Sequence, residues 1–229
     1  MLHSYGTDVD NNIKELNRLV GKTLSEINES FQYVGDKYNQ LLAKNTKIQK
    51  GIVGDFIEEI ICCKVKDNLP ELDSALGDVK TISVNSSGAA RENLRITAIN
   101  FQKMVSTPYQ DSSLAYKTKE NLIVVKIEPN KVDSTQSVFR GVYKINLAEN
   151  DVQKKLVDDY NNVREFVLKG KACELTSKKD QANTVVKTYS HGTGTNLKKY
   201  TIENREYTAK GKAFYLFKNE INTMIKEYA

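Results

Sequence analysis

The stretch "LPELDSALGDVKTISVN" (69–85) is the part of the sequence on which the expected fold depends. Within it, residues 78–84 have the apolar pattern of a buried strand. Asp78 and Lys80 stand two residues apart there, and side chains two apart in a strand point to the same face. An acid and a base on one face of a strand expected to be central require a chemical explanation.

The composition is that of a globular chain. The 229 residues are 39% hydrophobic and 28% charged, which is enough for one substantial core. No run reaches the roughly 18 apolar residues of a membrane span, and the N-terminus lacks the features of a signal peptide, so we expect a cytoplasmic protein without a membrane partner. The spacing of Cys62, Cys63 and Cys173 fits reduced thiols better than a zinc site. A net charge of +5 permits a polyanionic partner.

Hydrophobic periodicity predicts helices first, then strands, then a mixture of both. The expected helices are 9–20, 23–31, 52–65, 146–170 and a last one ending near 228. The expected strands are 78–84, 94–98, 121–127, 137–145 and 213–217. Thr23 with Glu26, and Asn146 with Glu149, have the spacing of capping boxes. This order predicts a mixed α/β or α+β fold in a single domain, 1–229, with two lobes and a cleft.

The acids upstream of the strand complete a pattern typical of metal-dependent nucleases. Pro70–Glu71 followed by Asp78–Val79–Lys80 has the form PD-(D/E)xK. Carboxylate and carbonyl oxygens are the ligands that Mg²⁺ prefers, and a lysine can orient the attacking water. We therefore expect Mg²⁺ as the cofactor, Glu71, Asp78 and the Val79 carbonyl as its ligands, and Lys80 as a catalytic residue. The alternative is an ion pair on an exposed strand edge, where short D-x-K strings are common.

Another candidate carboxylate belongs to the helix before this strand. Glu58 lies at the rim of the apolar stripe expected in 52–65, from where it can reach a metal site on the adjacent strand. Gly54, one turn earlier, allows another segment to approach closely. The alternative for Glu58 is a glutamate that faces solvent.

Four segments together resemble the MutH family, which comprises the methyl-directed mismatch-repair nickase and related restriction endonucleases that cleave at GATC. These segments are "GKTLSEI" (21–27), "KGIVGDFIEEI" (50–60), "ALGDVKTISV" (75–84) and "KAFYLFKNEINTMI" (212–225). They occur in the order of the family between about residues 20 and 226. The resemblance implies a restriction-endonuclease-like core, with a mixed central sheet flanked by helices. It also implies an N-terminal lobe with the active site and a C-terminal lobe with DNA-recognition loops.

The resemblance extends to "SSLAYKTKENLIVV" (112–125), similar to the family segment in which a lysine precedes a central strand and supports the active site. The matching residue is Lys117, with Lys119 as the neighbouring alternative. A solvated lysine at the entrance of a strand is the other interpretation.

The chain departs from the family pattern at both acids. Asp78 stands where the family usually has Glu, and Glu71 where it usually has Asp. The two changes leave the total reach of the pair similar. Asp73 is the alternative first carboxylate, but it leaves fewer residues before Asp78 than the family has. Glu71 keeps the family spacing and the preceding Pro70, and is favoured.

For DNA contacts, the resemblance points to the C-terminal part of the chain. Within "VVKTYSHGTGTN" (185–196), Lys187 matches a basic position, and the glycine-containing part beyond it can approach a groove closely. Tyr215 matches a family tyrosine that lies near the adenine and senses its methylation; otherwise it is a half-buried strand aromatic. The candidate DNA-binding residues are Lys187, His191, Thr193, Lys212, Tyr215 and Lys218.

These observations favour a type II restriction endonuclease that cleaves double-stranded DNA at a GATC-like site with Mg²⁺. A chain with one active site then requires a transient dimer on DNA, or two sequential nicks, to cut both strands. The alternatives are a mismatch-repair nickase that depends on an activator protein of that pathway, and a non-catalytic DNA-binding module of the same fold.

Overall fold

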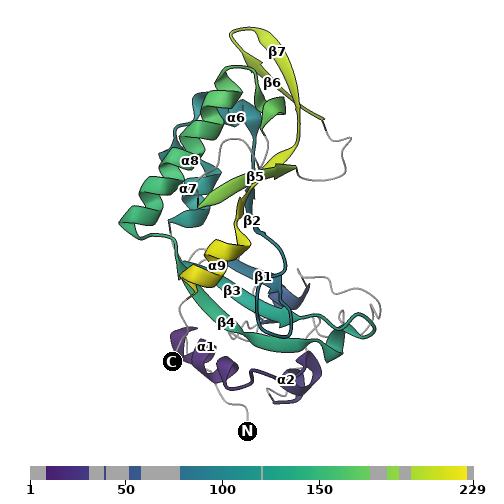
Figure 1. Ribbon diagram of the computed structural model, residues 1–229. Coiled ribbons are helices and arrows are strands. Elements are labelled where there is room, and N and C mark those ends of the chain that lie inside the picture. The colour runs from purple at the N-terminus through teal and green to yellow at the C-terminus, as the bar shows by residue number, and fades with distance from the viewer. Residues whose placement is uncertain are drawn as a thin grey trace. The chain divides into compact units, whose positions relative to one another are not determined.

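The computed structural model divides into two compact units, and their helices and strands are drawn in Figure 1. The first unit comprises 1–92, 121–145 and 221–229, and the second comprises 93–120 and 146–220. The residues that the structure describes are 9–30, 39, 52–57, 78–119, 121–175, 185–190 and 197–225, with the backbone alone for 9–12 and 78. The fold is mixed α/β, as expected, but the strands within these ranges form three separate sheets.

The first unit contains a three-stranded sheet of order β1-β3-β4. Its strands are β1 (Asp78–Ser83), β3 (Asn121–Glu128) and β4 (Val138–Asn146), which confirms the three strands predicted there. The expectation that the strand of Asp78 is central is wrong, because among the described strands β3 is the middle one and β1 lies at an edge of the sheet. β1 and β3 are parallel, with Asp78 opposite Leu122 and Ser83 opposite Ile127. The other elements are α1 (Val9–Asn17), α2 (Leu24–Ser30), the helical residues 52–57 and η2 (Ser134–Gln136).

Helices and sheet of the first unit share one apolar core. Ile13 and Leu16 of α1 and Phe56 of the 52–57 helix are fully buried in it, and Ile123 and Val125 contribute from β3. The predicted close approach at Gly54 is confirmed, because a Cβ there would lie 3.0 Å from the Thr81 Oγ1 on β1. The 52–57 helix therefore lies directly against the strand that begins at Asp78.

The first predicted capping box is confirmed. The Thr23 backbone N–H donates to Glu26 Oε2 at 2.7 Å, and the Glu26 N–H donates to Thr23 Oγ1 at 3.2 Å. The Thr23 bond lowers the pKa of the Glu26 carboxyl. This reciprocal pair fixes the start of α2 after the turn at Gly21.

The second unit contains an antiparallel sheet in which β8 is the central strand. The order is β2 (Leu94–Ala98), β8 (Lys212–Leu216) and β5 (Val186–Ser190). A separate two-stranded sheet consists of β6 (Leu197–Ile202) and β7 (Arg205–Lys210). The helices are α6 (Phe101–Ser106), η1 (Tyr109–Asp111), α7 (Ser113–Thr118), α8 (Asn150–Leu168), η3 (Ala172–Glu174) and α9 (Lys218–Met224), which continues into the first unit.

The start predicted for the long helix is wrong, whereas its end is confirmed. α8 begins at Asn150, and the Asn146 Oδ1 accepts the Ala148 N–H at 3.1 Å in a turn instead of capping the helix. At the C-terminus, Gly170 has φ +71° and its N–H donates to the Val167 carbonyl at 2.9 Å. That geometry is a glycine-terminated helix end.

Within the described ranges, no helix is both long enough and apolar enough to cross a membrane.

Candidate functional site

Lys80 lies on β1, as its position in the sequence predicts. The register places Val79 and Thr81 opposite Ile123 and Val125, the core residues of β3, so alternation puts Lys80 on the other face of the sheet. The side chain is half-buried, and its Nζ lies 3.5 Å from the Val79 carbonyl oxygen. The ammonium is therefore next to the carbonyl that the sequence pattern indicates as a metal ligand.

The carboxylates of the predicted metal site are not described at the level of their side chains. Glu58, Glu71 and the alternative Asp73 lie outside the described residues, and Asp78 is described as the first residue of β1 by its backbone alone. In the described part of the chain, no three His, Cys, Asp or Glu side chains group together as a metal site. The donor types of the predicted set, two carboxylates and one carbonyl, nevertheless suit Mg²⁺.

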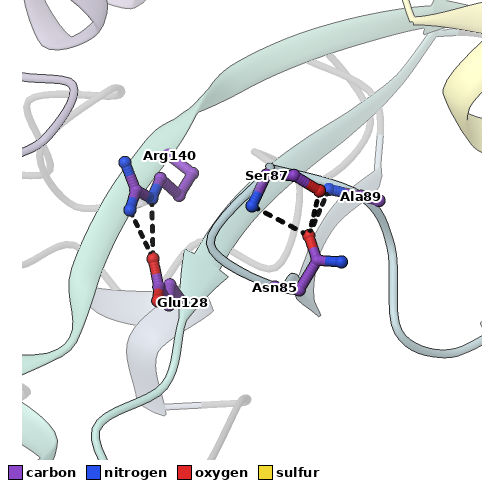
Figure 2. A network of polar contacts seen from close by, with 5 residues as sticks. All are labelled: Asn85, Ser87, Ala89, Glu128 and Arg140. Atoms are coloured by element: carbon purple, nitrogen blue, oxygen red, sulfur yellow. Dashed lines mark hydrogen bonds and ion pairs between the residues drawn. The ribbon is translucent and has the colours of Figure 1, made fainter.

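The turn after β1 is held by a dense set of side-chain contacts (Figure 2). Asn85 Oδ1 accepts the Ser87 N–H at 3.1 Å, the Ser87 hydroxyl at 2.7 Å and the Ala89 N–H at 2.9 Å. On the neighbouring strands, Arg140 Nε donates to Glu128 Oε2 at 2.9 Å. The Asn85 contacts fix the turn that follows β1, and the Arg140–Glu128 contact ties β4 to β3.

Lys117 lies in the last turn of α7, in the second unit, whereas Lys80 belongs to the first. α7 is tied to α8 through Gln153, whose Nε2 donates to the Thr118 carbonyl at 2.8 Å. Lys119, the alternative, follows α7 as its C-cap residue, with its Nζ 4.6 Å from the Tyr116 ring centroid. The sequence pattern does not predict α7, the helix that contains Lys117.

The sheet of the second unit brings two predicted DNA-binding residues together. Lys187 on β5 stands opposite Tyr215 on β8, and Arg95 on β2 stands opposite the same tyrosine. Directly paired residues share a face, so these three form one row across the sheet, a cation on each side of an aromatic ring. Lys187 and Tyr215 are half-buried, and Arg95 is exposed.

Two further aromatic residues extend this row. Tyr189 packs edge-on against Tyr215 with ring centroids 5.4 Å apart, and the Lys187 Nζ lies 4.5 Å from the Phe217 ring centroid. We call the set Arg95, Lys187, Tyr189, Tyr215 and Phe217 the basic aromatic face. Three of its members are not predicted from the sequence, because period-2 alternation identifies a strand face without identifying the neighbouring strand.

The other predicted DNA contacts differ in exposure. Lys212 is only 8% exposed, and its Nζ donates to the Ser190 Oγ at 3.3 Å. Burial, together with the charge of Lys210, lowers the pKa of the Lys212 ammonium. Lys218 is exposed at the start of α9, and its backbone N–H donates to Asn93 Oδ1 at 3.0 Å. His191 and Thr193 lie outside the described residues.

Asp159 positions the strand that carries Lys187, and no sequence pattern singles it out. This aspartate of α8 is 5% exposed, and its Oδ2 accepts the Val185 and Val186 N–H groups at 3.0 and 2.9 Å. Burial raises its pKa from 3.8 to about 6, although the two hydrogen bonds oppose the shift. The carboxylate therefore acts as a buried anchor for the beginning of β5.

The sequence matches no known protein-family model, and no curated protein is significantly similar to it. The resemblance to the MutH family accordingly rests on the segments quoted above.

Proposed function

We propose that this chain is a Mg²⁺-dependent DNA endonuclease of the MutH type, acting as a type II restriction enzyme at a short GATC-like site. The proposal includes a PD-(D/E)xK core in the first unit and DNA recognition by the second. Double-stranded DNA is the proposed substrate.

The basic aromatic face is the observation that carries the proposal. Lysine and arginine neutralise phosphates and donate to the guanine O6 and N7 atoms, and aromatic rings contact bases and sugars. Lys187, Arg95 and Tyr215 are aligned by strand pairing, so their spacing is set by the sheet and not by a loop. Two of the three, Lys187 and Tyr215, are also among the residues for which the resemblance to the MutH family implies DNA contacts.

On the catalytic side, Glu71, Asp78 and the Val79 carbonyl would hold Mg²⁺. When bound, the ion supplies Lewis-acid stabilisation of charge on the scissile phosphate and lowers the pKa of a water molecule. Lys80 is suited to orient the attacking water, because its ammonium already lies 3.5 Å from the Val79 oxygen. Glu58 is proposed as a supporting group.

The proposed reaction is hydrolysis of one phosphodiester bond. The water oxygen forms a new bond to phosphorus, the bond from phosphorus to the 3′ oxygen breaks, and the leaving oxygen takes up a proton. Lys80 compensates the negative charge that grows on the phosphate oxygens as this exchange proceeds. Nothing besides water is consumed.

A plasmid assay tests the proposal. The full chain is incubated with GATC-containing supercoiled plasmid and Mg²⁺, with and without adenine methylation of the site. Linear product from one methylation state supports a restriction enzyme, and nicked circles favour the repair nickase. Intact plasmid together with a gel shift would overturn the nuclease and leave a DNA-binding module.

A pair of matched variants locates the active site. Lys80→Ala should abolish cleavage while DNA binding is retained, since it removes a charge that acts on the transition state. Lys154→Ala removes an exposed lysine of α8 and serves as the control. Cleavage by Lys80→Ala at the control rate would refute the assignment of Lys80.

A further inference from the structure

The second unit also carries the hairpin of β6 and β7 (197–210), which we call the ribbon (Figure 1). Six residue pairs connect its two strands, from Leu197 opposite Lys210 to Ile202 opposite Arg205. The turn between them consists of two residues, Glu203 and Asn204, with φ values of 45° and 65°. Positive φ at both positions is typical of the tight turn that suits twisted strands, so the tip of the ribbon is narrow.

One face of the ribbon is anchored to the unit. Tyr200 is 1% exposed and stacks on Tyr207 with ring centroids 5.6 Å apart, and it also contacts Phe101 at 5.5 Å. Tyr207 lies against Gly170, where an added Cβ would come within 2.2 Å of the ring. Buried aromatic contacts therefore fix this face against the end of α8 and against α6.

Two hydrogen bonds from one side chain hold the ribbon near its turn, at Thr201 of β6. Gln102 of α6 accepts the Thr201 N–H at 2.8 Å and donates to the Thr201 carbonyl at 3.5 Å. A single side chain thus engages both backbone groups of an outer strand. The ribbon is anchored and is not a loose loop.

The opposite face points to solvent along its whole length. Its side chains are all exposed: Leu197, Lys199, Thr201, Glu206, Thr208 and Lys210. The ribbon as a whole has four cations, Lys198, Lys199, Arg205 and Lys210, against two acids, Glu203 and Glu206. The Lys199 Nζ lies 2.9 Å from Glu206 Oε1, so one acid is already compensated within the ribbon.

We propose that this outward face enters the major groove of duplex DNA and provides a second contact surface beside the basic aromatic face. This inference rests on the proposed function. The major groove is about 12 Å wide and admits a two-stranded ribbon. Lys199 and Lys210 are suited to guanine edges or phosphates, and the methyl groups of Thr201 and Thr208 to thymine methyls.

Continuity along the chain supports the assignment. β7 ends at Lys210 and β8 begins at Lys212, so a single intervening residue separates the ribbon from the strand that carries Tyr215. DNA bound on the basic aromatic face would therefore have the positive ribbon in the same unit within short reach. The excess of cations gives charge complementarity to a polyanion.

The experiment measures binding without cleavage. The full chain is titrated, in EDTA, against a fluorescent duplex of about 20 base pairs with a central GATC, over a series of salt concentrations. Lys199→Ala combined with Lys210→Ala should weaken binding about tenfold and lower the salt slope by roughly one to two. Glu206→Gln should instead tighten binding a few-fold, because it releases Lys199 and removes a negative charge from the outward face of the ribbon.

Matched controls come from the far end of α8. Lys154 and Asp151 form an exposed pair 3.4 Å apart, and Lys154 is 16 residues, or about 24 Å of helix, before Gly170. Lys154→Ala and Asp151→Asn change the net charge by the same amount per residue and should leave affinity within about twofold of wild type. Thermal melting checks that every variant is folded.

Groove placement has its own readout. Dimethyl sulfate methylates guanine N7, which lies in the major groove, so wild type should protect guanines that the double variant leaves reactive. The inference is overturned if the double variant binds DNA like wild type. It is also overturned if Lys154→Ala lowers DNA affinity by as much as each lysine removed from the ribbon does. A third outcome would overturn it as well: analytical ultracentrifugation could show that the wild-type chain self-associates, that the ribbon variants do not, and that this loss alone explains their weaker DNA binding.

The outcomes separate this inference from the proposed function. A wild-type chain that does not bind the duplex would refute both. Normal wild-type binding with unaffected ribbon variants would refute the ribbon alone. Impaired ribbon variants of a protein that binds DNA but cuts no plasmid would support the ribbon and refute the nuclease.

Discussion

Replacing the buried Asp159 with Asn should stabilise the protein in a manner that depends on pH. In the folded protein the pKa of this carboxyl is about 6, against an ordinary value of 3.8. The folded state therefore binds more protons than the unfolded state between these values, and its stability falls as pH rises through that window. The difference corresponds to at most about 3 kcal/mol, present below pH 4 and lost above pH 6.

The side-chain amide introduced by Asp159→Asn would keep an oxygen acceptor for the Val185 and Val186 N–H groups while carrying no charge. Urea unfolding followed by circular dichroism, from pH 4 to pH 8, gives the free energy of unfolding of both proteins. We expect the two to be similar near pH 4 and the Asn variant to be more stable by up to about 3 kcal/mol at pH 7. Subtracting the curves cancels every other titrating group.

Two controls make the result decisive. Asp158→Asn removes the exposed carboxylate one residue earlier and should not reproduce the trend. Asp159→Ala leaves two buried N–H groups unpaired and should be less stable than Asp159→Asn at every pH, by about 1–3 kcal/mol for each group. If the difference in free energy of unfolding between wild type and Asp159→Asn does not change with pH, burial does not raise the pKa of Asp159 and the assignment is refuted.

Three other perturbations test the fold and the face. Gly170→Ala should lower the melting temperature by several degrees, because it places a Cβ at φ +71° and within 2.2 Å of the Tyr207 ring; a rise would contradict the packing. Lys187→Ala should weaken duplex binding and reduce the salt slope by about 0.9, measured by fluorescence anisotropy; an unchanged slope would remove Lys187 from the interface. Thr23→Ala should lower the free energy of unfolding in urea by about 0.5–2 kcal/mol, because the Glu26 N–H then loses its acceptor, the Thr23 Oγ1. An unchanged free energy of unfolding would mean that the capping box does not stabilise the protein.

Local signals predict much of the first unit. The strand at Asp78, the buried strand at 121 and the capping box at Thr23 each depend on patterns within a few residues. Such patterns are governed by alternation, burial and backbone capping, which a single sequence contains. The placement of Asp78 and Lys80 on one strand is accordingly predicted from the sequence alone and confirmed, whereas their role in a metal site stays a prediction.

The pairing of strands that are distant in the sequence cannot be predicted from such local patterns. Sequence order groups β2 with the strands after it, yet it pairs with β8, more than a hundred residues later. The short helices α6 and α7 escape prediction because each has only six residues; their caps, Asn100 and Ser112, resemble ordinary loop residues. Asp159 escapes it because an aspartate in a helix is normally exposed, and only the arrival of β5 buries it.

The division of the chain constrains how the proposal can be tested. The chain passes between the two units at 92/93, 120/121, 145/146 and 220/221, and the last two passages fall within β4 and α9. Neither unit is a continuous segment, so truncation would break regular elements and expose apolar core. Point variants of the full chain are the appropriate tool.

If the proposed division of labour is correct, Lys80→Ala should bind DNA and not cut it. Lys187→Ala should lose cleavage only in proportion to its lost DNA binding, so a saturating concentration of this variant should restore the cleavage rate. A Lys187→Ala variant that remains inactive at saturation would place Lys187 in the chemistry itself.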